Sequence, residues 1–308
     1  MTAKRVRPPT LVNDALLRKW PLPKVDPKLG KEGRGDVLVI GGSRQIPGAP
    51  MLAGIAALRA GAGRLQIAIP HSASVLVAVS VPEARVIGLR EARSGELAPG
   101  CQQVLSNEIE AADAILIGPG MADERAAVEF LRHCARVRPK STLVVDAAAL
   151  RIFALAHRVA LPGKSMPEFI ATPHAGEMAN LWDCSRADVL RDPLPVARAA
   201  AAELGVVIAL KGARTFIVAP DGTAFQNDAG NVGLGTSGSG DILSGLIAGL
   251  CARGANALQA AVWGVYLHAK AGDALARRMG PLGFLARELL GEIPPLLRRT
   301  ARRTRLHP

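Results

Sequence analysis

The sequence predicts an α/β fold in which a mostly parallel central sheet is covered by helices on both faces. Short apolar runs alternate with longer stretches of helical character from about residue 35 to residue 295. Each run has the length of a buried strand and ends in glycine or polar residues. No linker or change of composition interrupts this stretch, so one domain is expected although 308 residues would allow two. This alternation is typical of parallel strands joined by crossover helices.

The first elements illustrate the pattern. Val37-Leu38-Val39-Ile40 is an apolar run closed by two glycines, and the alanine-rich stretch 49–60 is a strong helix former that Gly61 ends. The last 70 residues are mostly helical in character. Further strands are expected at 65–69, 114–117, 143–145, 169–170, 206–210, 216–219 and 224–226, and further helices at 124–136 and 263–276.

The two ends of the chain differ from this body. Residues 1–32 are rich in proline and basic residues and are expected to lie over or beside a domain of residues 33–296, and residues 297–308 form an arginine-rich tail. The net charge is +12, but two end clusters leave only about +4 for the body. Ten aromatic residues supply few stacking surfaces, so nucleic-acid binding is not expected. The end clusters are Lys4, Arg5, Arg7, Arg298, Arg299, Arg302, Arg303 and Arg305.

Three protein classes are not expected: zinc ribbons, disulfide scaffolds and membrane-spanning proteins. The four cysteines include no C-x-x-C pair in a long chain, which argues against a zinc ribbon or a disulfide scaffold. No apolar run approaches the ~18 residues of a membrane span, and prolines interrupt the first thirty residues. A cytoplasmic protein without signal peptide or membrane segment is expected.

Glycine or polar segments follow five of the expected strands. Ligands of parallel α/β sheets bind outside the carboxyl ends of the strands, so these segments predict one composite site. They are Gly41-Gly42-Ser43, Gly118-Pro119-Gly120, Asp146, Thr172-Pro173-His174 and Lys211-Gly212.

The segment Gly238-Ser239-Gly240-Asp241 runs directly into an apolar helix. Unpaired N–H groups at such a helix start bind anions, and glycines let a phosphoryl group approach. Asp241 could take the proton of an alcohol during phosphoryl transfer, or it could only cap the helix. The helix-start donors are expected to lower the pKa of Asp241 and keep it ionised at pH 7. The dinucleotide pattern Gly233-x-Gly235-x-x-Gly238 follows no apolar strand, and Gly163-Lys164-Ser165 lacks the first glycine of a P-loop, so both templates are rejected.

Three further residues have alternative interpretations. Lys211 could place an ammonium near phosphates or could simply belong to a strand-ending turn. His174 could contact a ligand with Glu177 near a hydrated Mg²⁺, but no third ligand for a zinc site is in sequence reach. His268 lies in an apolar helix and is expected to be a core histidine.

Together these segments resemble the ADP-dependent NAD(P)H-hydrate dehydratase family, a carbohydrate-kinase-related domain of the ribokinase-like superfamily, from about Gly35 to Pro295. The resemblance implies a three-layer ribokinase-like fold in its stand-alone form, without the N-terminal epimerase domain that the family often carries. It rests on Val39-Ile40-Gly41-Gly42-Ser43 with Pro47-Gly48-Ala49, on Gly118-Pro119-Gly120, Val144-Val145-Asp146-Ala147, Thr172-Pro173-His174 with Gly176-Glu177, Leu210-Lys211-Gly212 and Ser237-Gly238-Ser239-Gly240-Asp241.

The resemblance also implies an activity. The enzyme would be a hydro-lyase of metabolite repair that phosphorylates the C6 hydroxyl of (6S)-NADHX or NADPHX with ADP, or possibly ATP, and Mg²⁺. Loss of phosphate would then give NADH or NADPH, with AMP as the other product from ADP. Asp241 would be catalytic. Family positions matching Ala49, Gly120, His174 and Asp241 contact the hydrate, and those matching Lys211, Gly212, Ala213, Arg214, Thr215 and Gly240 contact the nucleotide.

Partners and alternatives follow from the same resemblance. A homo-oligomer, a tetramer in the family, and a separate epimerase activity are expected. Ser237 stands where the family usually has glycine, Ala148 where a second aspartate is common, and Ala175 where proline is common. The alternative function is a kinase of a small hydroxyalkyl heterocycle on the same fold. A polyanion-binding protein driven by the terminal arginines is a third reading, which the compact glycine-rich site argues against.

Overall fold

The computed structural model describes residues 7–137, 141–156 and 168–302 of the chain. The P-loop-like Gly163–Ser165 segment and the terminal residues Lys4, Arg5, Arg303 and Arg305 lie outside these ranges. The strands are β1 (Thr10–Leu11), β2 (Asp36–Ile40), β3 (Arg64–Pro70), β4 (Ala84–Leu89), β5 (Ala114–Ile117), β6 (Thr142–Val145), β7 (Phe169–Ala171), β8 (Val207–Leu210), β9 (Thr215–Val218) and β10 (Ala224–Asn227). The helices are α1 (Asp14–Lys19), α2 (Gly48–Arg59), α3 (His71–Ser80), α4 (Ser106–Ala111), α5 (Glu124–Val137), α6 (Arg151–Ala156), α7 (Ala175–Trp182), α8 (Arg186–Arg191), α9 (Pro193–Leu204), α10 (Ser239–Ala252), α11 (Ala257–Met279) and α12 (Ala286–Arg302).

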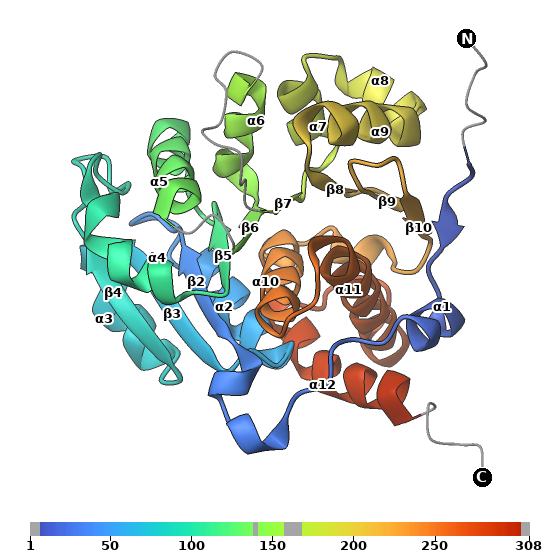
Figure 1. Ribbon diagram of the computed structural model, residues 1–308, viewed down its shortest axis with the longest axis horizontal. Coiled ribbons are helices and arrows are strands. Elements are labelled where there is room, and N and C mark those ends of the chain that lie inside the picture. Colours follow the sequence, from blue (N-terminus) through green and yellow to red (C-terminus); the bar gives the residue numbers. More distant parts are fainter. Residues whose placement is uncertain (1–6, 138–140, 157–167, 303–308) are drawn as a thin grey trace.

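The strands of the described residues form one sheet in the order β1-β10-β9-β8-β7-β6-β5-β2-β3-β4. Strands β2 to β8 pair in parallel, whereas β9 is antiparallel to both of its neighbours. Helices α5 to α9 lie on one face and α10 to α12 on the other (Figure 1). The predicted mostly parallel sheet with helices on both faces is therefore confirmed.

Successive side chains of the central strands point to opposite faces of the sheet and pack in two separate hydrophobic cores. In β2, Val37 and Val39 pack on the side of α2, α10 and α11, while Leu38 and Ile40 pack on the side of α4, α5 and α7. All four side chains are fully buried. A strand buried on both faces must be apolar throughout, which is why the sequence reads as a continuous run rather than as alternation.

Helices α2 and α10 pack unusually closely. A methyl group on Gly245 would collide with the Ala53 carbonyl, and one on Gly249 would collide with the Ala57 carbonyl. The two glycines are four residues apart and therefore lie on one face of α10. This contact fixes the N-terminal ends of the two helices next to one another, at the edge of the sheet where the site lies.

The sequence analysis missed α3 and β4. The α3 segment is rich in valine, which favours strands, but a crossover between the parallel strands β3 and β4 requires a covering element, and the segment forms a helix that buries Ala73 and Val77. β4 is the edge strand, so most of its side chains are only partly buried and no apolar run marks it.

The N-terminal segment joins the edge of the fold. β1 pairs in parallel with β10, Leu17 is fully buried, and the Trp20 ring stacks on Phe225 at 5.7 Å between centroids. The Tyr266 hydroxyl in α11 donates to the Asp14 carboxylate at 2.7 Å. At the other end α12 continues to Arg302, so the first residues of the arginine-rich tail are helical. None of the described helices has the length and apolar character needed to cross a membrane.

Candidate active site

The candidate active site lies along the carboxyl ends of β2, β5, β6, β7 and β8. These strands are neighbours and run parallel, so the five segments predicted from the sequence meet at one edge of the sheet. The chain order reverses between β2 and β5, because β3 and β4 extend to one side and β6 to β8 to the other. Ligands of open α/β sheets bind in the crevice at such a reversal.

The loops that follow β2 and β5 pack tightly at this reversal. The Gly42 N–H donates to the Pro119 carbonyl at 2.7 Å. Gly120 has φ +70°, and a Cβ there would lie 2.6 Å from the Ile46 carbonyl oxygen and 3.0 Å from Ala49 Cβ. Two of the expected substrate positions, Ala49 and Gly120, are therefore brought together, and only glycine fits the second of them.

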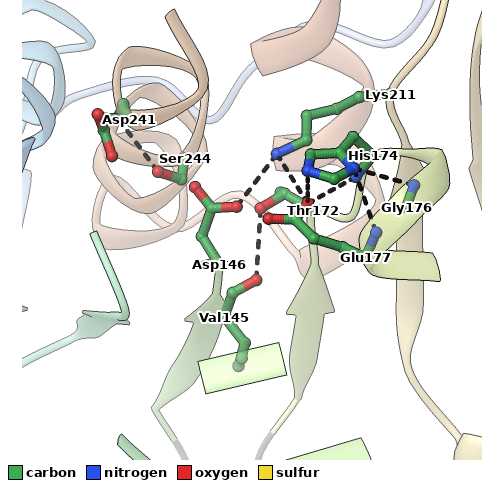
Figure 2. A network of polar contacts seen from close by, with 9 residues as sticks. All are labelled: Val145, Asp146, Thr172, His174, Gly176, Glu177, Lys211, Asp241 and Ser244. Carbon is green, nitrogen blue, oxygen red and sulfur yellow. Dashed lines mark hydrogen bonds and ion pairs between the residues drawn. The ribbon is translucent and has the colours of Figure 1, made fainter. Parts of the chain in front are cut away.

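Asp241 lies in the first turn of α10, beyond the sheet edge. The N-cap residue is Gly238, with φ +87° and no side chain to cap the helix. Among the described residues no hydrogen bond joins the Asp241 carboxylate to the helix start. The Ser244 hydroxyl donates instead to the backbone oxygen of Asp241 at 3.1 Å (Figure 2). The capping alternative is therefore wrong. The Ser239 N–H donates to the Thr236 carbonyl at 3.2 Å, but among the described residues the N–H groups of Gly240 and Asp241 and the Asp241 carboxylate have no such partner and are left for a ligand.

The expected direction of the Asp241 pKa is wrong. Burial raises the pKa of Asp241 to about 7, the negative charge of Asp146 adds to this, and Lys211 opposes it. The sequence indicated the helix-start donors, which lower the pKa of a carboxylate. It did not show that neighbouring elements bury this carboxyl and so raise its pKa. A carboxyl with a pKa near 7 is a better proton acceptor at neutral pH than one held far below it.

Lys211 links three strand ends through its ammonium group. Its Nζ lies 3.2 Å from Asp146 Oδ1 and 3.6 Å from Glu177 Oε2 (Figure 2). The Asp146 side chain is only 5% exposed. Burial opposes the charge on Lys211, but the two carboxylates outweigh it and the pKa of Lys211 is raised. The ammonium is therefore fixed as a cation, and an ideal Cβ on Gly240 would be 3.6 Å from it.

His174 and Glu177 form a capping box at the start of α7. His174 Nδ1 accepts from the N–H groups of Gly176 and Glu177 at 3.0 and 3.1 Å, and Glu177 Oε2 accepts from the His174 N–H at 2.7 Å. An accepting Nδ1 places the proton of the neutral ring on Nε2. Nε2 lies 3.6 Å from Glu177 Oε2, and the His174 side chain is 60% exposed, so the ring edge is accessible beside this carboxylate.

A pocket of about 790 Å³ opens beside Lys211, between the ends of β8 and β10 and helices α10 and α11. This volume is in the usual range for small-molecule sites. Five expected nucleotide positions line it, whereas Arg214 does not: its side chain is 70% exposed and lies 3.7 Å from Asp228. The five are Lys211, Gly212, Ala213, Thr215 and Gly240.

Several lining residues were not assigned to the site from the sequence. The 229–236 segment supplies much of the wall, and Ser239 and His268 meet there with Oγ and Nε2 2.9 Å apart. Burial lowers the pKa of His268 to about 4, so it is the expected buried histidine, held neutral beside the anion-binding helix start. The two residues are 29 positions apart, and no local pattern links them. Asp146 was expected at the composite site, but its pairing with Lys211 was not, because that pairing depends on the order of the strands.

Mg²⁺ is implied by the resemblance, and the donor set limits how it could be held. The carboxylates of Asp146 and Glu177 both face the Lys211 ammonium. The described residues contain no group of three or more His, Cys, Asp or Glu side chains that could hold a metal. These side chains therefore do not fit direct coordination of a resident ion. Mg²⁺ commonly takes most of its ligands from water and substrate phosphates.

Comparison with known proteins identifies the family. The sequence profile of the NAD(P)H-hydrate dehydratase family matches residues 37–295, most of the chain. The chain belongs to the NAD(P)H-hydrate dehydratase family. An ADP-dependent (S)-NAD(P)H-hydrate dehydratase from Xanthomonas campestris pv. campestris is 47% identical over 303 residues, covering 98% of this chain and all of the relative. The chain spans about half the length of the bifunctional NAD(P)H-hydrate repair enzymes that it also matches.

Solved structures agree with this NAD(P)H-hydrate dehydratase assignment. A ribokinase-like superfamily protein from Enterococcus faecalis superposes with a TM-score of 0.80 at 28% identity, covering 94% of this chain and 96% of its own. The Bacillus subtilis ADP/ATP-dependent NAD(P)H-hydrate dehydratase, co-crystallized with ATP/Mg²⁺, gives 0.78 at 28%, covering 97% and 100%. The predicted ribokinase-like fold is confirmed. Ser237, which stands where the resemblance implies glycine, is exposed and has no positive φ, so its side chain causes no backbone strain.

Proposed function

We propose that the protein repairs damaged nicotinamide cofactors by ADP-dependent dehydration of (6S)-NADHX and NADPHX. The substrate class rests on the full-length similarity to the Xanthomonas enzyme. The chemistry rests on one structural observation: the Asp241 carboxylate lies at the start of α10 without capping the helix, near the Lys211 ammonium. The loops after β2 and β5 lie at the same edge of the sheet. This arrangement combines an anion site, a fixed positive charge and a proton acceptor.

The proposed reaction has two steps. In the first, the β-phosphoryl group of ADP moves to the C6 oxygen of the hydrate, the hydroxyl proton passes to Asp241, and AMP leaves. The α10 N–H groups and Lys211 stabilise the charge on the transferred group. In the second, the C6–O bond breaks with phosphate as leaving group, a proton from the neighbouring ring carbon passes to water, and the electrons of that C–H bond form the restored ring double bond. Phosphorylation is needed because hydroxide is a poor leaving group.

The remaining contacts position the substrates. Ala49, Gly120 and the Nε2–H of His174 contact the hydrate, and the pocket lined by Lys211, Gly212, Ala213, Thr215 and Gly240 binds the nucleotide. The exposed Arg214 side chain lies by Asp228, outside the lining of this pocket, and would have to move to contact the nucleotide. Mg²⁺ enters with the nucleotide phosphates, with Glu177 reaching it only through water. No step is assigned to the ion.

A single spectroscopic assay tests the function. Incubation of the protein with hydrated NADH and ADP is expected to restore the dihydronicotinamide absorbance band and to release AMP and phosphate in equal amounts. The preference between nucleotides is measured by replacing ADP with ATP. The preference between hydrates is measured by replacing hydrated NADH with hydrated NADPH. A kinase of a small hydroxyalkyl heterocycle would instead leave a stable phosphorylated product and no such band. Absence of the band with every nucleotide and hydrate combination contradicts the proposal.

The partner proposals accompany this function. A homo-oligomer of the tetrameric kind is tested by light scattering during gel filtration. A separate epimerase activity is proposed because this enzyme uses only the S epimer of the hydrate. With a mixture of epimers, the yield of NADH should stop near the fraction of the S epimer. Addition of an epimerase should then raise the yield.

The pH dependence of turnover is expected to report Asp241. The pKa of this carboxyl is raised to about 7 and the base form is required, so kcat/KM should fall tenfold per pH unit as pH drops below about 7. Above this value the rate should level off. The profile is measured with both substrates below their KM, over a range in which the melting temperature shows the protein folded. A flat profile between pH 5 and 8 would mean that Asp241 is not the titrating base.

A further inference from the structure

The segment that follows β4 forms a hairpin over the point where the strand order reverses. Residues 90–98, here called the 90–98 hairpin, are closed by an antiparallel bridge between Glu91 and Leu97 and by the Ala92 N–H donating to the Glu96 carbonyl at 2.8 Å. Leu97 is fully buried and anchors the hairpin in the core. The sequence analysis assigned nothing to this segment.

The hairpin is attached to the loop after β5 through Glu96. Its Oε2 accepts hydrogen bonds from the N–H groups of Ala122 at 3.2 Å and Asp123 at 3.4 Å. These two residues directly follow Gly120 and Met121, and Asp123 caps the start of α5 by accepting from Arg125 and Ala126. A charged acceptor that holds two backbone donors fixes the course of this loop.

The hairpin is also attached to the loop after β2. The Arg44 N–H donates to the Gly95 carbonyl at 2.8 Å, and the Arg44 guanidinium pairs with Glu91, which also accepts from the Ser72 hydroxyl at 2.7 Å. Gly95 has φ +86°, and a Cβ there would lie 2.8 Å from Arg44 Cβ. Only glycine permits this approach without strain.

We infer that the 90–98 hairpin, through Glu96 and Gly95, is a positioning element that sets the spacing of the two loops contacting the nicotinamide hydrate. The inference rests on the proposed function. One hairpin holds both loops, which also bond directly through Gly42 and Pro119. The nucleotide pocket, by contrast, is lined by residues from β8 onward and by His174, and among the described residues no hydrogen bond or ion pair joins these to the hairpin. Loss of the hairpin contacts should therefore affect one substrate and not the other.

The test is a comparison of KM values. Glu96→Ala removes the acceptor of two hydrogen bonds and is expected to raise KM for hydrated NADH about tenfold, the usual worth of such bonds. KM for ADP should stay within twofold. Glu96→Gln keeps an acceptor oxygen and should recover most of the loss. Gly95→Ala loosens the other attachment and should give the same selective rise. Glu83→Ala, which removes an exposed carboxylate near the β4 edge, is the matched control and should match wild type.

The outcomes separate this inference from the function itself. Wild-type turnover of hydrated NADH with ADP tests the proposed function in the same assay, before any variant is considered. Equal changes in both KM values, or none, for Glu96→Ala and Gly95→Ala would overturn the positioning role. Glu96→Gln behaving like Glu96→Ala would also overturn it, because the acceptor oxygen that glutamine keeps would then not position the loop. Melting temperatures within a few degrees of wild type show that the variants are folded.

Discussion

Asp241→Asn is expected to lower kcat by about 10²–10⁴, the usual contribution of a general base. The amide keeps the shape of the side chain but cannot take the hydroxyl proton at C6. The binding of ADP should change little, because the N–H groups at the start of α10 remain in place. Kd for ADP is measured by calorimetry and kcat by return of the dihydronicotinamide band. Asp221→Asn, in an exposed turn between β9 and β10, makes the same chemical change away from the site and serves as the control.

The same variant should be more stable than wild type at neutral pH. Because the folded-state pKa of Asp241 is raised to about 7, the folded protein holds this proton more tightly than the unfolded chain does. The associated stability is fully present below the ordinary aspartate pKa and is lost as pH rises through about 7. Asparagine carries no such penalty, so the melting temperature of Asp241→Asn should exceed that of wild type at pH 8. The difference should shrink toward pH 4.

If kcat of Asp241→Asn were within a few-fold of the wild-type kcat, another group would accept the proton. A kcat loss accompanied by a lower melting temperature at every pH would instead point to a structural carboxyl. The two measurements therefore distinguish a base from a residue that only supports α10, and neither depends on the identity of the nucleotide.

The sequence predicted the strands that are buried on both faces, because such strands must be apolar along their whole length. β2, β5 and β8 are of this kind, and the polar residues that follow them were rightly expected at one edge of the sheet. The edge strand β4 and its helix α3 were not predicted, since partial burial removes the apolar run that marks a strand. The parallel pairing of β1 with β10 joins residues more than 200 positions apart, a contact that no local pattern reports.

The site was predictable in its parts but not in its electrostatics. Glycine, lysine and aspartate at strand ends and at a helix start were visible in the chain. The pairing of Lys211 with Asp146 requires the strand order, and the raised pKa of Asp241 requires knowing how deeply the carboxyl is enclosed. The i, i+3 spacing of His174 and Glu177 suggested a shared ligand or hydrated Mg²⁺, and the capping box that the two side chains form at the start of α7 was not foreseen.

Lys211→Ala is expected to raise KM for ADP about 30-fold or more. The ammonium would form a largely buried ion pair with the phosphates, and removal of one partner of such a pair weakens binding by about this much. KM for the hydrate should change no more than two- to threefold, because Ala49 and Gly120 lie on loops that Lys211 does not touch. Lys270→Ala is the matched control. Lys270 also pairs with an aspartate, Asp273 at 3.1 Å, but it does not line the pocket.

Removing the ammonium also changes the carboxylates around it. Asp146 and Glu177 lose their shared cation, so the melting temperature should fall. Lys211 lowers the pKa of Asp241, and its loss should move the acid limb of the kcat/KM profile to higher pH. Lys211→Ala combined with Asp146→Asn removes an uncompensated buried charge and should recover stability. The double variant should not recover ADP binding, because the positive charge facing the phosphates is still missing.

The double variant therefore decides what Lys211 does. Recovery of both stability and ADP affinity would make the lysine a structural partner of Asp146 and nothing more. Recovery of stability alone would assign the ammonium to the phosphates. The place of Lys211 on the wall of the nucleotide pocket, next to Gly240, favours the second result. A fixed cation next to a carboxyl that changes its charge near pH 7 is what phosphoryl transfer to a hydroxyl group requires at this sheet edge.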